Sequence, residues 1–382
     1  MADRTATRTP DETADSTTVL FAGGGTGGHL YPGLAIARTL VRLDPGVQPV
    51  FVGALRGIER SVLPGTEFPH LLLDLHPLYR TKPWQNWRTI LGAVGAWRRL
   101  GALAREKQPK LVVGTGGYAA GVALAYAAMH GIPIVQQAGD SYPGLTARAF
   151  RRWTQEYYLA FPEAARVIGG DSAQHVDTGA PIEPPPRPRP DRAASRRAWG
   201  FPAQDGPVLL IYGGSQGSRA INVVVAEWVK RGLPDDLYLI WMTGKASYAE
   251  FAALDGPRVK VRDYLSPIAD AYAATDLALV RAGAMTTAEL FAWGIPAVLV
   301  PLPTAAADHQ SVNARTLEGA GAAINLPQAE LTVDRLDATL RSLIGDPPAM
   351  QRLAQGARAR ARPDAAETIA RRILVLLSRD KV

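Results

Sequence analysis

Cysteine is absent from the chain, and so is any long apolar run. Without cysteine the protein cannot form disulfides, bind zinc through thiolates or use a thiol nucleophile. The six histidines are scattered, which argues against a histidine metal cage, and we expect neither a metal nor a cofactor. No uninterrupted apolar stretch reaches the roughly 18 residues of a membrane-spanning helix. Residues 1–18 are polar, so we expect a disordered leader and no signal peptide.

The net charge of +7 indicates an anionic partner. A phosphorylated ligand, an anionic membrane surface and nucleic acid all fit such a charge. The densest basic stretch, Arg187–Arg197, is diluted by prolines, and no basic run has the length of a nucleic-acid-binding arm. We therefore expect no nucleic acid partner.

A chain of 382 residues is longer than one core usually fills, so two domains are expected. Short apolar runs alternate with helical stretches, which is typical of βαβ units and a mostly parallel sheet. Helices are predicted, among others, over Leu34–Leu43, Trp87–Lys107 and Ala120–Met129. The predicted strands are Val19–Ala22, Pro49–Ala54, His70–Leu75, Leu111–Gly114, Ile132–Ala138, Glu156–Phe161, His175–Gly179, Val208–Tyr212, Leu237–Met242, Val259–Val261, Leu277–Val280 and Ala297–Pro301.

The proline-rich segment Ala180–Pro190 interrupts this alternation. Proline removes a backbone donor and favours extended chain, so the segment is typical of a linker. We predict a first domain over 19–180, a linker over 181–205 and a second domain over 206–362. A last helix within 363–382 could lie against either domain.

Glycine-rich turns close three of the predicted strands, at 23–28, 114–117 and 213–217. Glycine lets the backbone approach a ligand, and the helix that follows such a turn presents unpaired N–H groups to an anion. His29 ends the first turn, where a histidine could deprotonate a hydroxyl. A structural turn with a solvated histidine is the alternative interpretation.

Two further polar groups follow strands in the second half. Glu289 lies near the start of a predicted helix, where a carboxylate can accept two ribose hydroxyls or simply complement the helix dipole. The cluster Asp308–Asn313 offers amide side chains suited to sugar hydroxyls. Its alternative interpretation is an ordinary helix start capped by Asp308.

In chain order these segments resemble the MurG family of bacterial glycosyltransferases. The motifs that carry the resemblance are G-G-G-T-G-G-H-x-x-P-G at 23–33, G-x-x-x-G-I-E-x-x-x-x-P at 53–64, G-x-G-G-Y at 114–118, P-G-L-T at 143–146, G-G-S-Q-G at 213–217, R-x-G-A-x-T-x-x-E at 281–289 and D-H-Q-x-x-N-A at 308–314. The resemblance implies α/β architecture with two Rossmann-like domains facing a cleft (GT-B). It also implies inverting, metal-independent transfer of N-acetylglucosamine from UDP-N-acetylglucosamine to the C4 hydroxyl of undecaprenyl-diphosphate-linked N-acetylmuramoyl-pentapeptide.

The resemblance further implies roles for individual residues. His29 would be catalytic, with Asp140 as the next candidate base. The donor would contact Ser215, Gln216, Gly217, Arg281, Ala284, Met285, Thr286, Glu289, Gln310 and Asn313. The acceptor and its diphosphate would contact Gly25, Thr26, Gly27, Gly28, His29, Gly116, Gly117 and Tyr118.

Two departures from the family pattern stand out. Where the family commonly has H-E-Q-N, this chain has Gln137–Asp140, and the family's N-P-V-R is here Ala180–Glu183, without its donor-contacting arginine. Arg187, Arg189 or Arg281 could replace that arginine. These changes leave open a related glycolipid transferase with another sugar or lipid, or a catalytically reduced sugar-nucleotide-binding scaffold.

One segment mixes aromatic and basic side chains as membrane-surface segments do. We expect it to dock the first domain on the cytoplasmic face of the cell membrane, as a peripheral protein with other cell-wall synthesis proteins as possible partners. Packing of the same residues on their own domain is the alternative. The residues are Leu78, Tyr79, Arg80, Lys82, Trp84, Trp87 and Arg88.

Overall fold

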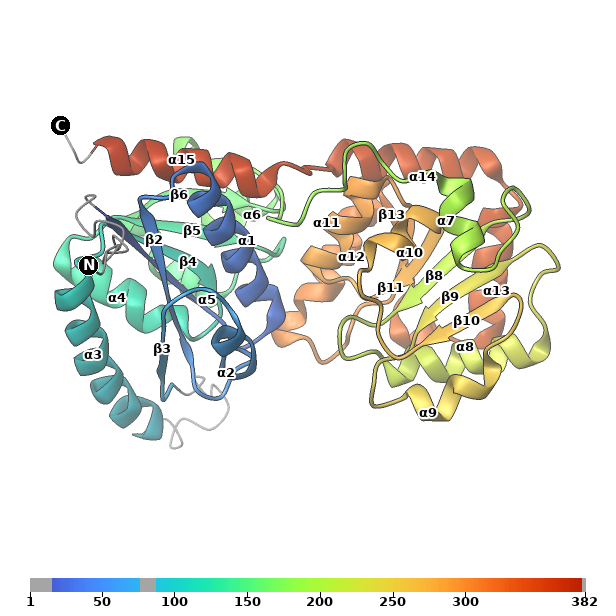
Figure 1. The fold of residues 1–382 in the computed structure, drawn as a ribbon, viewed down its shortest axis with the longest axis horizontal. Coiled ribbons are helices and arrows are strands. Elements are labelled where there is room, and N and C mark those ends of the chain that lie inside the picture. The colour runs from blue at the N-terminus through green and yellow to red at the C-terminus, as the bar shows by residue number, and fades with distance from the viewer. Residues whose placement is uncertain (1–15, 76–86, 380–382) are drawn as a thin grey trace, which may run out of the picture. The chain divides into compact units, whose positions relative to one another are not determined.

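The computed structural model describes residues 16–75 and 87–379. These residues form two β-sheets flanked by helices (Figure 1). Neighbouring strands run parallel in both sheets, as in β1 with β2 and β8 with β9. The predicted architecture of two Rossmann-like α/β domains is confirmed.

The first sheet has the strand order β3-β2-β1-β4-β5-β6-β7. Its strands are β1 (Thr17–Gly23), β2 (Val47–Ala54), β3 (His70–Leu73), β4 (Leu111–Gly116), β5 (Ile134–Ala138), β6 (Thr154–Leu159) and β7 (His175–Asp177). The helices along this stretch of chain are α1 (Gly27–Leu43), α2 (Glu59–Val62), α3 (Trp87–Lys107), α4 (Ala120–His130), α5 (Leu145–Ala149) and α6 (Ala164–Ile168).

The second sheet has the order β10-β9-β8-β11-β12-β13. Its strands are β8 (Val208–Tyr212), β9 (Tyr238–Met242), β10 (Val259–Arg262), β11 (Leu277–Val280), β12 (Ala297–Leu299) and β13 (Ala323–Asn325). The helices here are α7 (Arg192–Ala198), α8 (Arg219–Arg231), α9 (Tyr248–Phe251), α10 (Ala269–Ala274), α11 (Ala284–Trp293), α12 (His309–Gly319), α13 (Val333–Ile344), α14 (Pro347–Arg360) and α15 (Ala365–Arg379).

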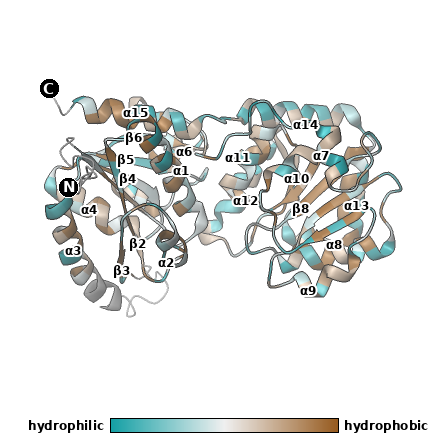
Figure 2. Ribbon diagram, in the orientation of Figure 1, coloured by the Kyte–Doolittle hydropathy of each residue, from teal (hydrophilic) through white to brown (hydrophobic). Residues whose placement is uncertain are grey.

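Strand β8 shows why this sheet needs helices on both faces. Val208, Leu210 and Tyr212 pack into one buried cluster, whereas Leu209 and Ile211 pack into another. Alternate side chains of a strand point to opposite faces, so both faces of β8 are apolar and both are covered. The hydrophobic colouring of this strand is visible in Figure 2.

The contacts divide the chain into two compact units. The first comprises residues 1–136, 152–155 and 370–382, and the second comprises residues 137–151 and 156–369. The loop after β5, which carries Asp140, therefore belongs to the same unit as the second sheet. Helix α15 crosses the division, since its residues up to Ile369 cluster with the second unit and those from Ala370 with the first.

The predicted strands are all found, with ends shifted by up to two residues. Strand β13 was not predicted, because Ile324 is its only large apolar residue and no apolar run indicates it. Helix α1 begins at Gly27 rather than Leu34, since Thr26 takes the N-cap position in extended backbone. Helix α7 lies inside the segment predicted as linker. None of the helices in the described ranges is long and apolar enough to cross a membrane.

Candidate active site

In the first unit a buried carboxylate organises the glycine turn after β1. Glu59 is fully buried, and its Oε1 accepts hydrogen bonds from the backbone N–H of Gly25 (2.8 Å) and of Ala54 (3.3 Å). A Cβ at Gly24 would overlap this carboxylate, and one at Gly53 would lie 2.9 Å from Glu59 Cγ. Gly24, Gly53 and Gly57 are therefore needed to admit the Glu59 side chain.

His29 lies in the first turn of α1, beside the glycines that end β4. Its Nδ1 lies 2.9 Å from Thr26 Oγ1. A Cβ at Gly116 would lie 2.6 Å from His29 Cδ2, so glycine is required for the ring to pack there. Gly116 also has a φ of 95°, in the left-handed region that favours glycine. The turn after β4 thus shapes the space around the imidazole.

The residues predicted to meet the acceptor lie on these two turns and on the start of α1. Gly27 and Gly28 belong to the first turn of α1, where a helix leaves its N–H groups without intrahelical partners. Tyr118 packs on Gly25, where a Cβ would lie 2.9 Å from its ring. One detail differs from the expectation: the Gly25 N–H already donates to Glu59, so it is not available to a diphosphate in this conformation.

In the second unit a buried arginine organises the glycine turn after β8. Arg281 follows β11 and is 7% exposed. Its Nη1 donates to the carbonyls of Val300 and Pro301, and its Nη2 donates to Ser218 Oγ and Gln328 Oε1. Burial lowers the pKa of Arg281 to about 10.

Ser218 is the N-cap of α8, so this guanidinium holds the end of the turn that carries Ser215, Gln216 and Gly217. Both terminal nitrogens of Arg281 are engaged with protein groups. The geometry therefore favours a supporting role for Arg281 over direct contact with a donor.

Glu289 stands at the end of a chain of hydroxyl groups. It lies in α11, whose first turn contains the predicted donor residues Ala284, Met285 and Thr286. Tyr272 donates its O–H to Glu289 Oε2 (2.7 Å), and the Tyr272 and Tyr212 hydroxyls are 2.9 Å apart. Burial raises the pKa of Glu289, the Tyr272 hydrogen bond opposes that shift, and the Glu183 carboxylate reinforces it.

The cluster at the start of α12 joins the loop after β5. Asp140 accepts from His309 Nδ1 and from Asn313 Nδ2, each at 2.9 Å. The Asn313 Oδ1 accepts from the backbone N–H and the hydroxyl of Ser141, and its Nδ2 also donates to the Ala282 carbonyl. The hydrogen bond that His309 donates to Asp140 raises the pKa of His309, against the opposing effect of burial.

This network changes the interpretation of two predicted residues. Asn313 is fully buried and all its amide positions are bonded to protein, which favours a structural role over direct contact with a sugar. Asp140 positions His309 through one oxygen and Asn313 through the other, which favours a positioning role over that of a base. Gln310 Oε1 accepts a hydrogen bond from the Leu302 N–H (3.0 Å), so its amide NH₂ is the part suited to donate to a ligand.

The linker arginines that could replace the family's arginine near position 183 are bonded to other protein groups. Arg187 pairs with Asp364 at 3.1 Å, and Arg189 donates to the Ala292 and Trp293 carbonyls. Position 183 itself holds a glutamate, and its negative charge raises the pKa of Glu289. This side of the second unit is therefore more acidic than the family pattern predicts.

Sequence reasoning missed three residues that shape these sites: Glu59, Tyr272 and His309. Glu59 has no signal in the sequence beyond its place in the motif at 53–64, and its packing against Gly24, Gly53 and Gly57 is visible only in the fold. Tyr272 lies in an apolar helix 17 residues before Glu289, with no local signal of their contact. His309 contacts Asp140 across 169 residues, so its local sequence does not indicate this pair. The predicted membrane residues 78–84 lie outside the described residues, and the side chains of Trp87 and Arg88 are likewise not described.

Family models match both halves of the chain. The glycosyltransferase family 28 N-terminal domain matches residues 19–159, and the family 28 C-terminal domain matches residues 208–369. With two parallel-sheet α/β domains of this kind, the protein is a glycosyltransferase.

More specific similarity comes from whole-length relatives. A Salinibacter ruber protein named UDP-N-acetylglucosamine–N-acetylmuramyl-(pentapeptide) pyrophosphoryl-undecaprenol N-acetylglucosamine transferase is 41% identical, covering 94% of this chain and 97% of its own. A Chlorobaculum parvum protein of the same name is 38% identical, covering 94% of this chain and 99% of its own. The crystal structure of Acinetobacter baumannii MurG matches with a TM-score of 0.73 and 27% identity, over 94% of this chain and 99% of that one. The chain belongs to the MurG family of N-acetylglucosaminyltransferases, which confirms the resemblance seen in its motifs.

Proposed function

We propose that this enzyme transfers N-acetylglucosamine from UDP-N-acetylglucosamine to undecaprenyl-diphosphate-linked N-acetylmuramoyl-pentapeptide, the step from lipid I to lipid II in peptidoglycan synthesis. The observation that carries the proposal is the 41% identity, over nearly full length, to a relative named for this transfer. The glycine turns, His29 and Glu289 are the residues to which we assign roles in it.

In the proposed reaction the acceptor C4 oxygen bonds to the anomeric carbon of N-acetylglucosamine. The bond from that carbon to the UDP phosphate oxygen breaks with inversion, and the hydroxyl proton passes to a base. His29 is the proposed base. When its Nδ1–H donates to Thr26 Oγ1, the lone pair that a base needs resides on Nε2.

The second unit is the proposed donor-binding unit. The turn 213–217 and the start of α11 offer backbone N–H groups to the diphosphate, and the buried Arg281 holds the turn in shape with a positive charge behind it. Glu289, oriented by Tyr272, accepts the ribose hydroxyls. The Gln310 amide donates to the sugar.

The direct test supplies radiolabelled UDP-N-acetylglucosamine and a short-chain lipid I analogue to the purified enzyme. Labelled disaccharide lipid is the expected product. Release of UDP with no labelled disaccharide would contradict the proposed acceptor.

A second candidate keeps the fold and the donor chemistry but changes the sugar or the lipid. It is favoured by the two acidic replacements near the donor residues: Asp140, bonded to His309, and Glu183, near Glu289. A panel of UDP-sugars offered with the same lipid acceptor separates the two candidates, because only the second predicts faster turnover of a sugar other than N-acetylglucosamine.

We also propose that the enzyme acts as a peripheral protein at the cytoplasmic face of the cell membrane. The support is the aromatic and basic sequence pattern of residues 78–88, since each Lys or Arg near an anionic surface contributes about 1 kcal/mol. Sedimentation with anionic vesicles tests it. Binding should fall with salt and in the double variant Trp84→Ser with Arg80→Glu, and equal binding by both proteins would exclude this segment.

A further inference from the structure

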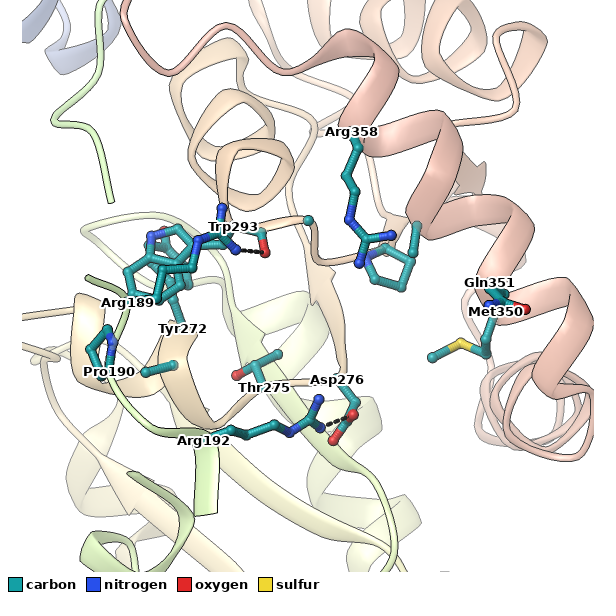
Figure 3. Close-up of a pocket in the computed structure, with 14 residues that line it drawn as sticks. Arg189, Pro190, Arg192, Tyr272, Thr275, Asp276, Trp293, Met350, Gln351 and Arg358 are labelled. Carbon is teal, nitrogen blue, oxygen red and sulfur yellow. Dashed lines mark hydrogen bonds and ion pairs between the residues drawn. The ribbon is translucent and has the colours of Figure 1, made fainter. Parts of the chain in front are cut away.

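The second unit contains a cavity of about 400 Å³ (Figure 3), and none of its lining residues belongs to the glycine turn after β8. Thr275 and Asp276, which line it, come just before β11, and Gly294 and Pro296 come just before β12. The cavity is therefore at the amino-terminal edge of the sheet. The turn 213–217 and the start of α11 follow the carboxyl ends of β8 and β11, at the opposite edge.

Positive charge dominates the cavity wall. The lining includes three arginines, Arg189, Arg192 and Arg358, against one acid, Asp276. That acid is already engaged: it forms an ion pair with Arg192, accepts the Val208 N–H at 2.9 Å and lies 3.9 Å from Arg196. Asp276 is thus shared by two guanidinium groups. Within the described ranges the other two lining arginines, Arg189 and Arg358, form no ion pair with a carboxylate.

Arg358 is the arginine best placed to bind a ligand. Among the described residues its guanidinium donates no hydrogen bond and forms no ion pair, and in Figure 3 it points into the hollow from α14. It lies against Gly294, where a Cβ would be 2.9 Å from Nε. Gly294 ends α11 with a φ of 74°, so a residue with a side chain would be strained there and would also displace Arg358.

Arg189 provides a second positive charge in a fixed position. Its guanidinium lies over the Trp293 ring, 5.7 Å from the centroid, and its terminal nitrogens donate to the last carbonyls of α11. Packing on an aromatic ring together with two hydrogen bonds restrains this side chain. An anion entering the cavity would therefore meet a charge that is already oriented.

We propose that this cavity binds a small organic phosphate, with the phosphoryl group on Arg358. A guanidinium presents two parallel N–H groups that match phosphate oxygens. The volume is larger than one phosphate needs and lies within the range of small-molecule sites, about 300–1,000 Å³.

Two walls of the cavity come from segments that link the sheets. Arg189 and Arg192 belong to the stretch between β7 and β8, and Arg358 belongs to α14, which leads into α15. A bound phosphate would tie these two segments to each other. The inference goes beyond the proposed transfer and does not depend on its substrates.

The test measures thermal stabilisation of the full chain by inorganic pyrophosphate at constant ionic strength. In wild type the unfolding temperature should rise with pyrophosphate. Arg358→Glu should shift the half-effective concentration about tenfold upward, the scale of one charged hydrogen-bond pair. The matched control is Arg352→Glu, an exposed arginine on the same helix that does not line the cavity and should behave as wild type.

Pyrophosphate bound at the glycine turns contributes equally to all three proteins, so only the difference between the two variants reports on the cavity. Arg358→Lys should fall between wild type and Arg358→Glu, because it keeps the charge and loses the planar fork. If Arg358→Glu is unstable without ligand, Arg358→Gln replaces it in the comparison. Equal responses to pyrophosphate in wild type and all variants would overturn the site. So would a loss in Arg352→Glu as large as the loss in Arg358→Glu. An equal Arg358-dependent response to citrate would overturn the assignment to phosphate.

Discussion

The glycine turns after β1 and after β8 occupy the same place in their sheets, yet they are supported by opposite charges. Each follows the strand that stands third in its sheet order, and each leads into a helix. Behind the first turn lies the buried carboxylate of Glu59, and behind the second lies the buried guanidinium of Arg281.

This difference separates the chemistry of the two turns. Glu59 occupies the Gly25 N–H and places a carboxylate beside a turn that would otherwise suit an anion. The Arg281 side chain does not occupy the backbone N–H groups of its turn, and it adds a positive charge behind that turn. We infer that the second turn is the stronger diphosphate site, and that the first turn chiefly positions His29.

The largest expected effect comes from removing that histidine. His29→Ala should lower turnover by about 100-fold or more, the usual scale for a lost general base, with the donor dissociation constant little changed. Steady-state kinetics with the lipid I analogue, together with donor binding by calorimetry, provides the measurement. Turnover close to wild type would remove His29 from the mechanism and make Asp140 the next residue to test.

Removing each supporting charge in turn tests the comparison between the two glycine turns. Arg281→Met should raise the donor dissociation constant by about 30-fold, because a cation worth roughly 2 kcal/mol behind the turn is lost. Glu59→Gln should leave donor binding unchanged, since Glu59 supports the other turn. A thermal melt checks that both variants fold. Similar donor affinity in Arg281→Met and wild type would show that the buried charge does not decide where the diphosphate binds.

A smaller effect is expected at Glu289. Glu289→Ala should raise the donor dissociation constant by about tenfold, for a charged hydrogen bond worth roughly 1.5 kcal/mol. Tyr272→Phe should raise it by about threefold, because it keeps the carboxylate and loses only the group that orients it. Wild type should bind a 2′-deoxy donor more weakly than the normal one. Equal binding of both donors would show that Glu289 does not hold the ribose.

The smallest effect concerns pH. Asp140 raises the folded-state pKa of His309 above the ordinary 6.5, so this pair stabilises the fold fully below pH 6.5. That contribution is lost as the pH rises through the higher folded-state value. Urea unfolding across this pH range should therefore show that the free energy of unfolding of wild type declines with rising pH. The decline should be flatter in Asp140→Asn. The same slope in His309→Gln and wild type would show that another group titrates.

Much of the fold could be predicted from local patterns. Val208–Tyr212 and Leu277–Val280 match the predicted strands residue for residue, because a short apolar run ended by glycine or charge needs no distant information. The glycine turns were visible for the same reason. Helix α7 and strand β13 were not, since α7 has no large apolar side chain and β13 has one, Ile324, so neither shows an apolar face or run.

The sequence by itself determined which residue types stand at the ends of the strands, and with them the family and the class of reaction. The tertiary structure alone decided which of those polar groups are used by the protein itself. Asn313 bonds Ser141 from 172 residues away, and Arg281 bonds Ser218 from 63 residues away. A buried polar group must find a partner. Because these partners are brought together only when the sheets form, no local pattern could show that Arg281 and Asn313 bond the protein through their side-chain nitrogens, while Gln310 bonds it through Oε1.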